Sequence, residues 1–334
     1  MIRTSSGIAT LLKSRSIQIA FLLWLLLSIS GILLSRDGIP LNIPALRRMP
    51  PISAILFSSI AIAVLLVEMG IVLFLARGRP FPQLELRAPD CAIAKKETLS
   101  LWIYIALVML AGRYLGLHFF SEGIAMHLNG SVVGATRIQS PLEVCTWAAY
   151  NGILLALVPY IAFRRRGYSH QALNLKSANL KNDCLVIAVI LLISCLLDLA
   201  GPNSFELSPR QQFLGGLASF LLNMAGTDLP IMILLYGILL PRYVKLTSPL
   251  TGYLLGAASY PAMHLFESWT RYGTMASSAA SVVFVFLTFF PPGLMKSFLT
   301  MRTGNAWVHL WAFHAISPHV TVDTRLIVDD FGIK

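Results

Sequence analysis

Long apolar runs alternate with short polar segments along most of this chain. A bilayer hydrocarbon core about 30 Å thick is crossed by roughly 20 helical residues, and most of the runs reach that length. The pattern therefore predicts an all-α fold, a polytopic transmembrane helical bundle of about eight or nine spans. The predicted spans are residues 16–34, 52–76, 99–118, 142–163, 184–201, 213–240, 249–266, 277–295 and 304–320.

The composition points to the same class of protein. Of the 334 residues, 56% are hydrophobic and only 12% are charged, which is typical of a polytopic membrane protein. The segments between the predicted spans are too short for a soluble domain of useful size. The lipid bilayer is therefore the first partner that we expect.

The formal net charge of +11 raises the question of a nucleic-acid partner. The Lys and Arg residues, however, are sorted by loop rather than gathered in one patch, and such sorting reports membrane topology. Most of them lie in segments on the same side as the N-terminus, including residues 77–98 and 164–182 and, late in the chain, Lys296 and Arg302. We expect an integral, multi-pass membrane protein with a cytoplasmic N-terminus and no nucleic-acid partner.

The chain divides into three parts of different character. Residues 1–212 hold about five transmembrane helices that are mostly plain and apolar. Residues 213–320 concentrate His, Asp, Glu and Pro inside their spans, and residues 321–334 form a short polar tail. The second part is therefore the predicted functional core.

Three histidines five residues apart lie in the segment HLWAFHAISPH, residues 309–319. Histidine inside a membrane span usually faces the bundle interior or a wet cavity, so this run suggests a metal site or a proton relay. Since an α-helix turns about 100° per residue, however, no single face of one would carry all three. Pro318 disfavours helical geometry before it, so we expect His319 at or beyond the helix end, and we interpret His309 as a packing residue.

Partners for His314 are available on the two spans that begin at residues 213 and 249. Tyr260 and His264 are four residues apart and share a helical face, with Glu267 on the same side. Asp228 is the only acidic residue in the earlier span. The helical rise from the cytoplasmic ends puts Asp228, His264 and His314 at depths of about 18, 22 and 15 Å, so they can meet in one layer.

Two segments that carry these histidines resemble motifs of a known family. YPAMH, residues 260–264, is similar to the Phe-x-x-x-His motif of the CPBP intramembrane proteases, the CAAX-processing and bacteriocin-processing group also called Abi. GNAWVHLWAFHA, residues 304–315, is similar to the last helix of that family, with His314 at its histidine. The resemblance covers residues 213–320 and implies an intramembrane endopeptidase that processes membrane-associated or prenylated peptides.

The chain departs from the family at the first and last motifs. Aligned on the stretch YGILLPRY, it has Ile231 and Met232 where the family has a Glu-Glu pair, and Tyr236 where the family has arginine. Pro318 stands at the terminal Asn or Asp position. In the family one glutamate is taken to activate the attacking water, and an apolar Ile-Met pair cannot accept that proton.

Three functions stay open on these residues. The first is a divergent protease in which Asp228, one turn before the missing glutamates, is the general base. The second is a catalytically inactive membrane scaffold or immunity-type protein, and the third is a small proton-coupled transporter, since intramembrane Asp, Glu and His also mark ion paths. For the protease, the catalytic residues would be Asp228, His264 and His314, and the supporting residues Tyr260, Glu267 and His319.

A divalent metal such as Zn²⁺ is the cofactor that these residues would suit. A catalytic zinc site takes three protein ligands and keeps one open position. His264 and His314, with Glu267 or Asp228 as the third ligand, could supply them.

His319 and Asp323, four residues apart, allow two interpretations. They belong either to a solvated tail or to a pair at the helix mouth that positions His314. Both interpretations stay open on the sequence.

Overall fold

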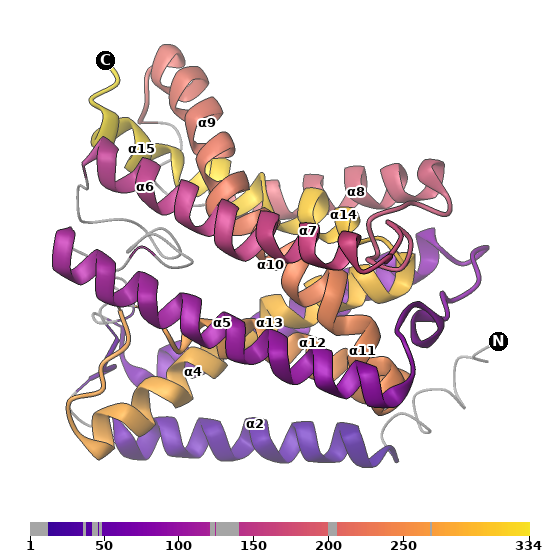
Figure 1. Cartoon of the computed structure of the whole chain (residues 1–334). Coiled ribbons are helices and arrows are strands. Elements are labelled where there is room, and N and C mark those ends of the chain that lie inside the picture. The colour runs from indigo at the N-terminus through magenta and orange to yellow at the C-terminus, as the bar shows by residue number, and fades with distance from the viewer. Residues whose placement is uncertain are drawn as a thin grey trace.

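The structure is a computed structural model, and it describes residues 13–35, 38–41, 46, 49–120, 124, 140–199, 206–267 and 269–334. Within these ranges the fold is an all-α bundle, which confirms the prediction from the apolar pattern (Figure 1). Seven helical runs in the described part of the chain are long and apolar enough to cross a membrane.

These seven runs follow one another along most of the chain. They are α2 (Arg15–Leu34), α4 (Pro51–Leu75), α5 (Cys91–Phe119), α6 to α7 (Pro141–Arg165), α8 (Leu180–Leu199), α9 to α11 (Pro209–Leu246) and α13 (Met275–Thr303).

Capping side chains followed by proline mark the start of several helices. Ser140 accepts a hydrogen bond from a backbone N–H of the first turn of α6, and Ser208 does the same for α9. Ser248 caps α12 (Pro249–His264) in the same way, and proline is the first residue of all three helices. These residues satisfy N–H groups that a helix start leaves without partners, and proline has no N–H there to satisfy.

The two remaining predicted spans are helical but irregular. α12 has only 16 residues and contains Pro261. The region 304–320 is a succession of short pieces: α14 (Ala306–His309), η5 (Leu310–His314) and η6 (Ser317–Val322). Both regions nevertheless run along the bundle beside the longer helices (Figure 1).

Consecutive helices run in alternating directions, so the connections gather at the two ends of the bundle (Figure 1). The connections after α4, α7, α11 and α13 lie at the right-hand end in the figure, together with the N-terminal end of α2. This grouping brings the basic segments 77–98 and 164–182 to one end, in agreement with the alternation that the loop charges predicted.

Charged side chains fix that end of the bundle. Arg79, after α4, donates to the carboxylate of Asp183 in α8 and to the carbonyl of Thr303 at the end of α13. Arg87 donates to the side-chain oxygen of Asn174 at 2.6 Å. The connections after α4, α7 and α13, which are distant in sequence, are thereby held together.

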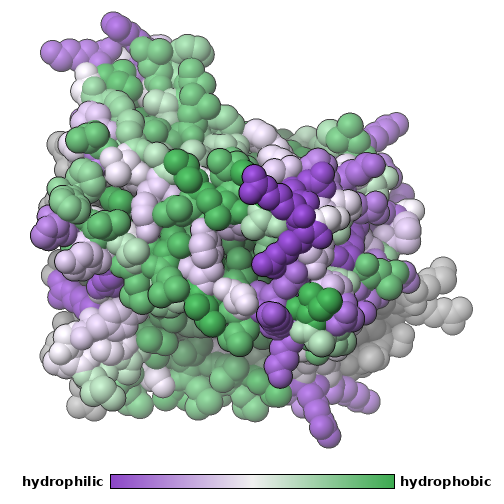
Figure 2. Space-filling view, viewed as in Figure 1, coloured by the Kyte–Doolittle hydropathy of each residue, from purple (hydrophilic) through white to green (hydrophobic). Residues whose placement is uncertain are grey.

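The outer surface between the two ends is strongly apolar. Figure 2 shows hydrophobic residues over much of the visible face, with hydrophilic residues gathered mainly on its right-hand part and along its left and upper edges. In α2 the large apolar side chains are exposed, among them Phe21, Leu26 and Leu33. An exposed apolar surface of this extent is expected where lipid is the solvent.

The centre of the molecule is the long run from α9 to α11. Every residue from Pro230 to Val244 is buried, and α12, α13 and the C-terminal run pack around this stretch. Ile231 and Met232, at the positions of the missing glutamates, have no exposed surface and belong to the apolar core. Asp228 is placed just before this buried stretch.

Both the central run and the C-terminal run contain wide, π-helical turns. In η5 and just beyond η6, backbone N–H groups bond to carbonyls five residues earlier: Ala315 to Leu310 at 2.8 Å and Asp323 to Pro318 at 3.2 Å. Since proline lacks an N–H, a regular α-helical ladder would be interrupted at Pro318, and the wider turn carries the helix across it. His319 lies within η6, so our expectation that it lies at or beyond the helix end is wrong.

The predicted polar tail is partly a packed helix. Residues Thr324–Phe331 form α15, which packs against α9, and its Leu326, Ile327 and Val328 are buried. The prediction described residues 321–334 as a polar tail, whereas apolar residues within them are buried against the rest of the bundle. This helix follows directly on the segment that carries His319 and Asp323.

Candidate functional site

His309, His314 and His319 form a continuous row. The ring centroids of His309 and His314 are 6.5 Å apart, and those of His314 and His319 are 5.2 Å apart. The prediction that no single face carries all three is wrong because it assumed α-helical rotation, whereas i→i+5 turns bring residues five apart onto one side.

Asp228 lies opposite this row. It ends the π-helical segment η3 (Met224–Asp228) near the middle of the α9 to α11 run, and its exposed fraction is 0%. Its Oδ1 is 3.3 Å from Nδ1 of His314 and 3.6 Å from Nε2 of His319. The structure therefore brings together a carboxylate and two imidazoles from segments more than eighty residues apart in the chain.

Asp323 supports the far side of His319. Its Oδ2 is 2.7 Å from Nδ1 of His319, and both side chains are buried. The hydroxyl of Ser219 in α9 donates to the backbone carbonyl of His319. Of the two interpretations from the sequence, the pair that acts on the histidines agrees with this geometry, and a solvated tail does not.

His264 lies in an aromatic layer beside this cluster. Its Nδ1 is 2.8 Å from the backbone oxygen of Tyr260, and its ring centroid is 3.8 Å from that of Phe289 and 4.5 Å from that of Tyr260. The Tyr260 ring in turn lies 6.1 Å from the ring of His314. Tyr260 thus contacts both histidines that the sequence predicted to share a site.

Glu267 follows the end of α12. Its side chain is buried, and its backbone oxygen accepts hydrogen bonds from Arg113 at 2.7 Å and from the hydroxyl of Thr270 at 2.6 Å. The predicted helical face of Tyr260, His264 and Glu267 therefore ends at His264, because the helix ends there.

Lys296 is the site residue that the sequence analysis missed. It was placed with Arg302 in a cytoplasmic connection, but both residues lie within α13 and each is only 2% exposed. The ammonium nitrogen of Lys296 is 3.6 Å from the centroid of the Tyr260 ring, which is a cation–π contact. A lysine directly after a predicted span, followed by more apolar sequence, was the signal that could have revealed it.

His309 is enclosed at the other end of the row. Its Nδ1 lies 3.1 Å from the hydroxyl oxygen of Thr300, and its ring packs at 4.4 Å against Tyr236. Tyr236, at the position of the family's arginine, has no exposed surface. These contacts agree with our interpretation of His309 as a packing residue.

The potential metal ligands that converge in the structure agree only in part with the predicted set: Asp228 and His314 were among the predicted ligands, whereas His319 was not. One oxygen of Asp228 and one nitrogen each of His314 and His319 all lie within 4.8 Å of one another, and all three side chains are buried. Among the described residues, no other group of three or more His, Cys, Asp or Glu meets this criterion. His264 and Glu267, predicted as ligands with His314, are outside this group.

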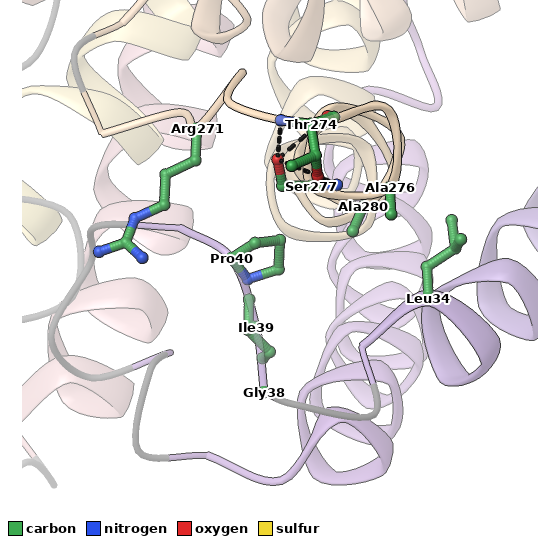
Figure 3. Close-up of a pocket in the computed structure, with 9 residues that line it drawn as sticks. All are labelled: Leu34, Gly38, Ile39, Pro40, Arg271, Thr274, Ala276, Ser277 and Ala280. Atoms are coloured by element: carbon green, nitrogen blue, oxygen red, sulfur yellow. Dashed lines mark hydrogen bonds between the residues drawn. The ribbon is translucent and has the colours of Figure 1, made fainter.

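An open pocket of about 400 Å³ lies elsewhere, between the end of α2 and the start of α13 (Figure 3). Leu34 and Arg271 lie on opposite sides of it, and the Thr274–Ser277 cap of α13 forms one wall. It contains no acidic or histidine side chain and shares no residue with the cluster around Asp228. We assign it no chemistry.

The apolar helices define an integral, multi-pass membrane protein. No protein-family model, curated protein or solved structure matches this chain. The resemblance of residues 213–320 to the CPBP proteases therefore stays a prediction, and the function has to be argued from the site itself.

Proposed function

We propose that this protein is a divergent, CPBP-like intramembrane endopeptidase that cleaves membrane-associated or prenylated peptides. One observation carries the proposal: the fully buried carboxylate of Asp228 lies 3.3 Å from the imidazole of His314. An ionisable group inside a membrane bundle is costly to keep, and such groups commonly serve function. A carboxylate beside an imidazole is also the usual pairing for moving a proton.

Asp228 takes the place of the missing glutamates in this proposal. Residues 213–240 contain no glutamate, and Ile231 and Met232 are part of the apolar core. Asp228 is therefore the one side chain of that segment able to accept a proton from water. Asp228 lies beside His314 and His319, whose imidazoles can exchange protons with it, as a general base requires.

The chemical step follows from these positions. Asp228 accepts a proton as the water oxygen bonds to the carbonyl carbon of the peptide, and an N–H of His314 donates to the oxygen that becomes negative. The carbon–nitrogen bond then breaks, and the proton held by Asp228 passes to the departing amine. His319 and Tyr260 pack against His314 and hold its ring in place.

The site is closed in this structure. Asp228, His314 and His319 are each at most 3% exposed. Entry of a peptide and of water therefore requires the helices around the cluster to separate, as lids and gates do in many enzymes.

A cleavage assay with a matched pair of variants tests the proposal. Purified protein is incubated with a panel of prenylated and unprenylated membrane peptides, and Asp228→Asn is compared with Glu143→Gln, another buried carboxylate, in α6. We expect Asp228→Asn to abolish turnover while substrate binding and folding persist, and Glu143→Gln to retain turnover. Full activity of Asp228→Asn would contradict the mechanism, and an inactive wild type would favour the scaffold.

The histidine row favours proton-coupled transport as the second candidate function. Three imidazoles at 6.5 and 5.2 Å, next to the buried charges of Asp228 and Lys296, have the composition of a proton path. Proteoliposomes with an internal pH dye separate the two functions. Proton flux coupled to solute uptake, without peptide cleavage, would support transport and contradict the peptidase.

A further inference from the structure

Three donor atoms converge beside the C-terminal histidine row. Oδ1 of Asp228 lies 3.3 Å from Nδ1 of His314 and 3.6 Å from Nε2 of His319, and one ligand atom from each of the three residues lies within 4.8 Å of the other two. They come from the central run and from two successive π-helical turns, so three separate backbone segments aim them at one point.

The separations fit a tetrahedral metal centre. Zinc binds imidazole nitrogen and carboxylate oxygen at about 2.0–2.2 Å, so neighbouring ligand atoms around a tetrahedral ion are about 3.3–3.5 Å apart. The distance from the Asp228 oxygen to His314, 3.3 Å, lies in that interval, and the distance to His319, 3.6 Å, exceeds it by about 0.1 Å. One nitrogen from each histidine lies within 4.8 Å of the other, and closing to the tetrahedral separation of about 3.3–3.5 Å would complete three corners.

The buried carboxylate of Asp228 would be stabilised by a bound cation. Both oxygens of Asp228 are buried, and neither accepts a hydrogen bond from any side chain or backbone group in the described ranges. A buried carboxylate is costly unless a cation or hydrogen bonds replace its lost hydration. Lys296 is a buried cation that could compensate the charge of Asp228, but its ammonium nitrogen lies over the Tyr260 ring, 3.6 Å from the ring centroid.

Asp323 supplies the outer support that metal-binding histidines have in proteins. It contacts Nδ1 of His319 at 2.7 Å, which leaves Nε2 of the same ring directed at Asp228. Such a carboxylate–imidazole contact fixes the ring and raises the basicity of the other nitrogen.

We propose that Asp228, His314 and His319 bind a divalent transition-metal ion of the zinc type, through Oδ1, Nδ1 and Nε2 respectively, with Asp323 orienting His319. Two imidazoles and one carboxylate suit such an ion, whereas Mg²⁺ and Ca²⁺ prefer oxygen ligands alone. The three protein ligands leave a fourth position for water or substrate.

This ligand set differs from the one that the sequence suggested. Nδ1 of His264 faces the backbone oxygen of Tyr260, and the His264 ring packs on Phe289. The proposed site uses His319 in place of His264, and of the two alternatives for the carboxylate ligand it takes Asp228 rather than Glu267. Both sets contain His314, so variants of His264 and His319 distinguish them.

The inference goes beyond the proposed peptidase activity and does not depend on it, because binding is measured directly. With the ion on Oδ1, the second oxygen of Asp228 stays available to accept a proton. Metal binding without cleavage would support the site and contradict the peptidase. Cleavage by chelator-treated protein that binds no metal would contradict the site and leave the peptidase standing.

Metal content and a spectroscopic probe test the site. Full-length protein in detergent is stripped with a chelator, dialysed against Zn²⁺ with excess Mg²⁺, and analysed for bound metal; we expect about one Zn²⁺ per chain. Co²⁺ is added to a second sample, where a tetrahedral site gives visible absorption bands that disappear when Zn²⁺, which has a filled d shell, displaces the probe. Size-exclusion profiles and circular dichroism confirm that each variant is folded.

Four variants decide between the ligand sets. His319→Gln and Asp228→Asn should lose the bound Zn²⁺ and the Co²⁺ bands, whereas His264→Gln should keep both. His309→Gln is the matched control, since it removes a buried histidine of the same row that is not a ligand. Wild-type protein that binds no Zn²⁺, or folded His319→Gln that binds it as the wild type does, would overturn the proposal.

Discussion

Asp323 fixes the tautomer of His319 through a contact of 2.7 Å between its Oδ2 and the imidazole Nδ1. A carboxylate can only accept in such a contact, so Nδ1 carries the hydrogen. In the neutral ring Nε2 then keeps its lone pair, and it is this nitrogen that lies 3.6 Å from Asp228. Asp323, which directly follows η6, thus determines that the nitrogen of His319 facing Asp228 carries a lone pair.

The first prediction concerns this pair. Asp323→Asn should weaken Zn²⁺ binding by about tenfold to a hundredfold, because loss of the carboxylate lets the His319 ring rotate and lowers its basicity. Competition of the purified variant against a chelating dye of known affinity measures the change. Asp329→Asn, an exposed acid of α15, should bind Zn²⁺ as the wild type does.

Gly226 gives the second prediction, since it lies two residues before Asp228. A Cβ there would meet the Trp147 ring at 2.3 to 2.6 Å, and Trp147 is fully buried. Gly226→Ala should therefore destabilise the protein by about 1–3 kcal/mol through overpacking and displace the carboxylate. Thermal unfolding in detergent measures the loss of stability.

Gly70→Ala is the control for that experiment. Gly70 lies in α4, and a Cβ added there meets no atom within 4 Å. The substitution should leave the melting temperature unchanged or raise it slightly, because alanine favours the helix. Equal melting temperatures for both alanine variants would contradict the close packing of Gly226 on Trp147.

Lys296 gives the third prediction. Lys296→Met should lower stability by about 3 kcal/mol, since removal of one member of a set of buried charges leaves the others uncompensated. The double variant Lys296→Met with Asp228→Asn should recover most of that loss. The free energies of unfolding of the two single variants and the double variant complete a double-mutant cycle. Additive losses of unfolding free energy would show that the two charges are independent.

The fourth prediction concerns topology. Cys91, at the start of α5, is exposed and lies at the end of the bundle that we expect in the cytoplasm. In a variant whose other three cysteines are serine, a membrane-impermeant maleimide should miss Cys91 in intact cells and label it after permeabilisation. Efficient labelling of intact cells would invert the orientation.

The fold class could be predicted from the sequence because lipid imposes a simple rule on it. Every segment that crosses must satisfy its own backbone hydrogen bonds, so a long apolar run is a helix whatever its neighbours are. The starts of α6, α9 and α12 were also readable, as Ser-Pro pairs at residues 140, 208 and 248. Which helices pack against one another could not be read from any such local sequence signal.

The site could be predicted only in part. Asp228 and His314 meet, as depth and the motif suggested, but His319 joins them only because the chain leaves α-helical geometry. A calculation at about 100° per residue places His319 away from His314 and cannot anticipate a wider turn. Lys296 was missed for a different reason: the predicted span ended at residue 295, whereas α13 continues to Thr303, so the lysine was counted as a loop charge.

The wide turns also set a rule for recognising relatives of this chain. Residues five apart share a side only while four residues stand between them. An insertion or deletion between His314 and His319 would therefore rotate one of the two proposed ligands away, whereas many substitutions there would not. The feature to preserve is therefore the unbroken spacing His-x₄-His-x₄-His-x₃-Asp, residues 309 to 323. A search that fixes this spacing without gaps, and ignores the identity of the intervening residues, would select candidate relatives whose histidines and aspartate can be arranged by the same wide turns.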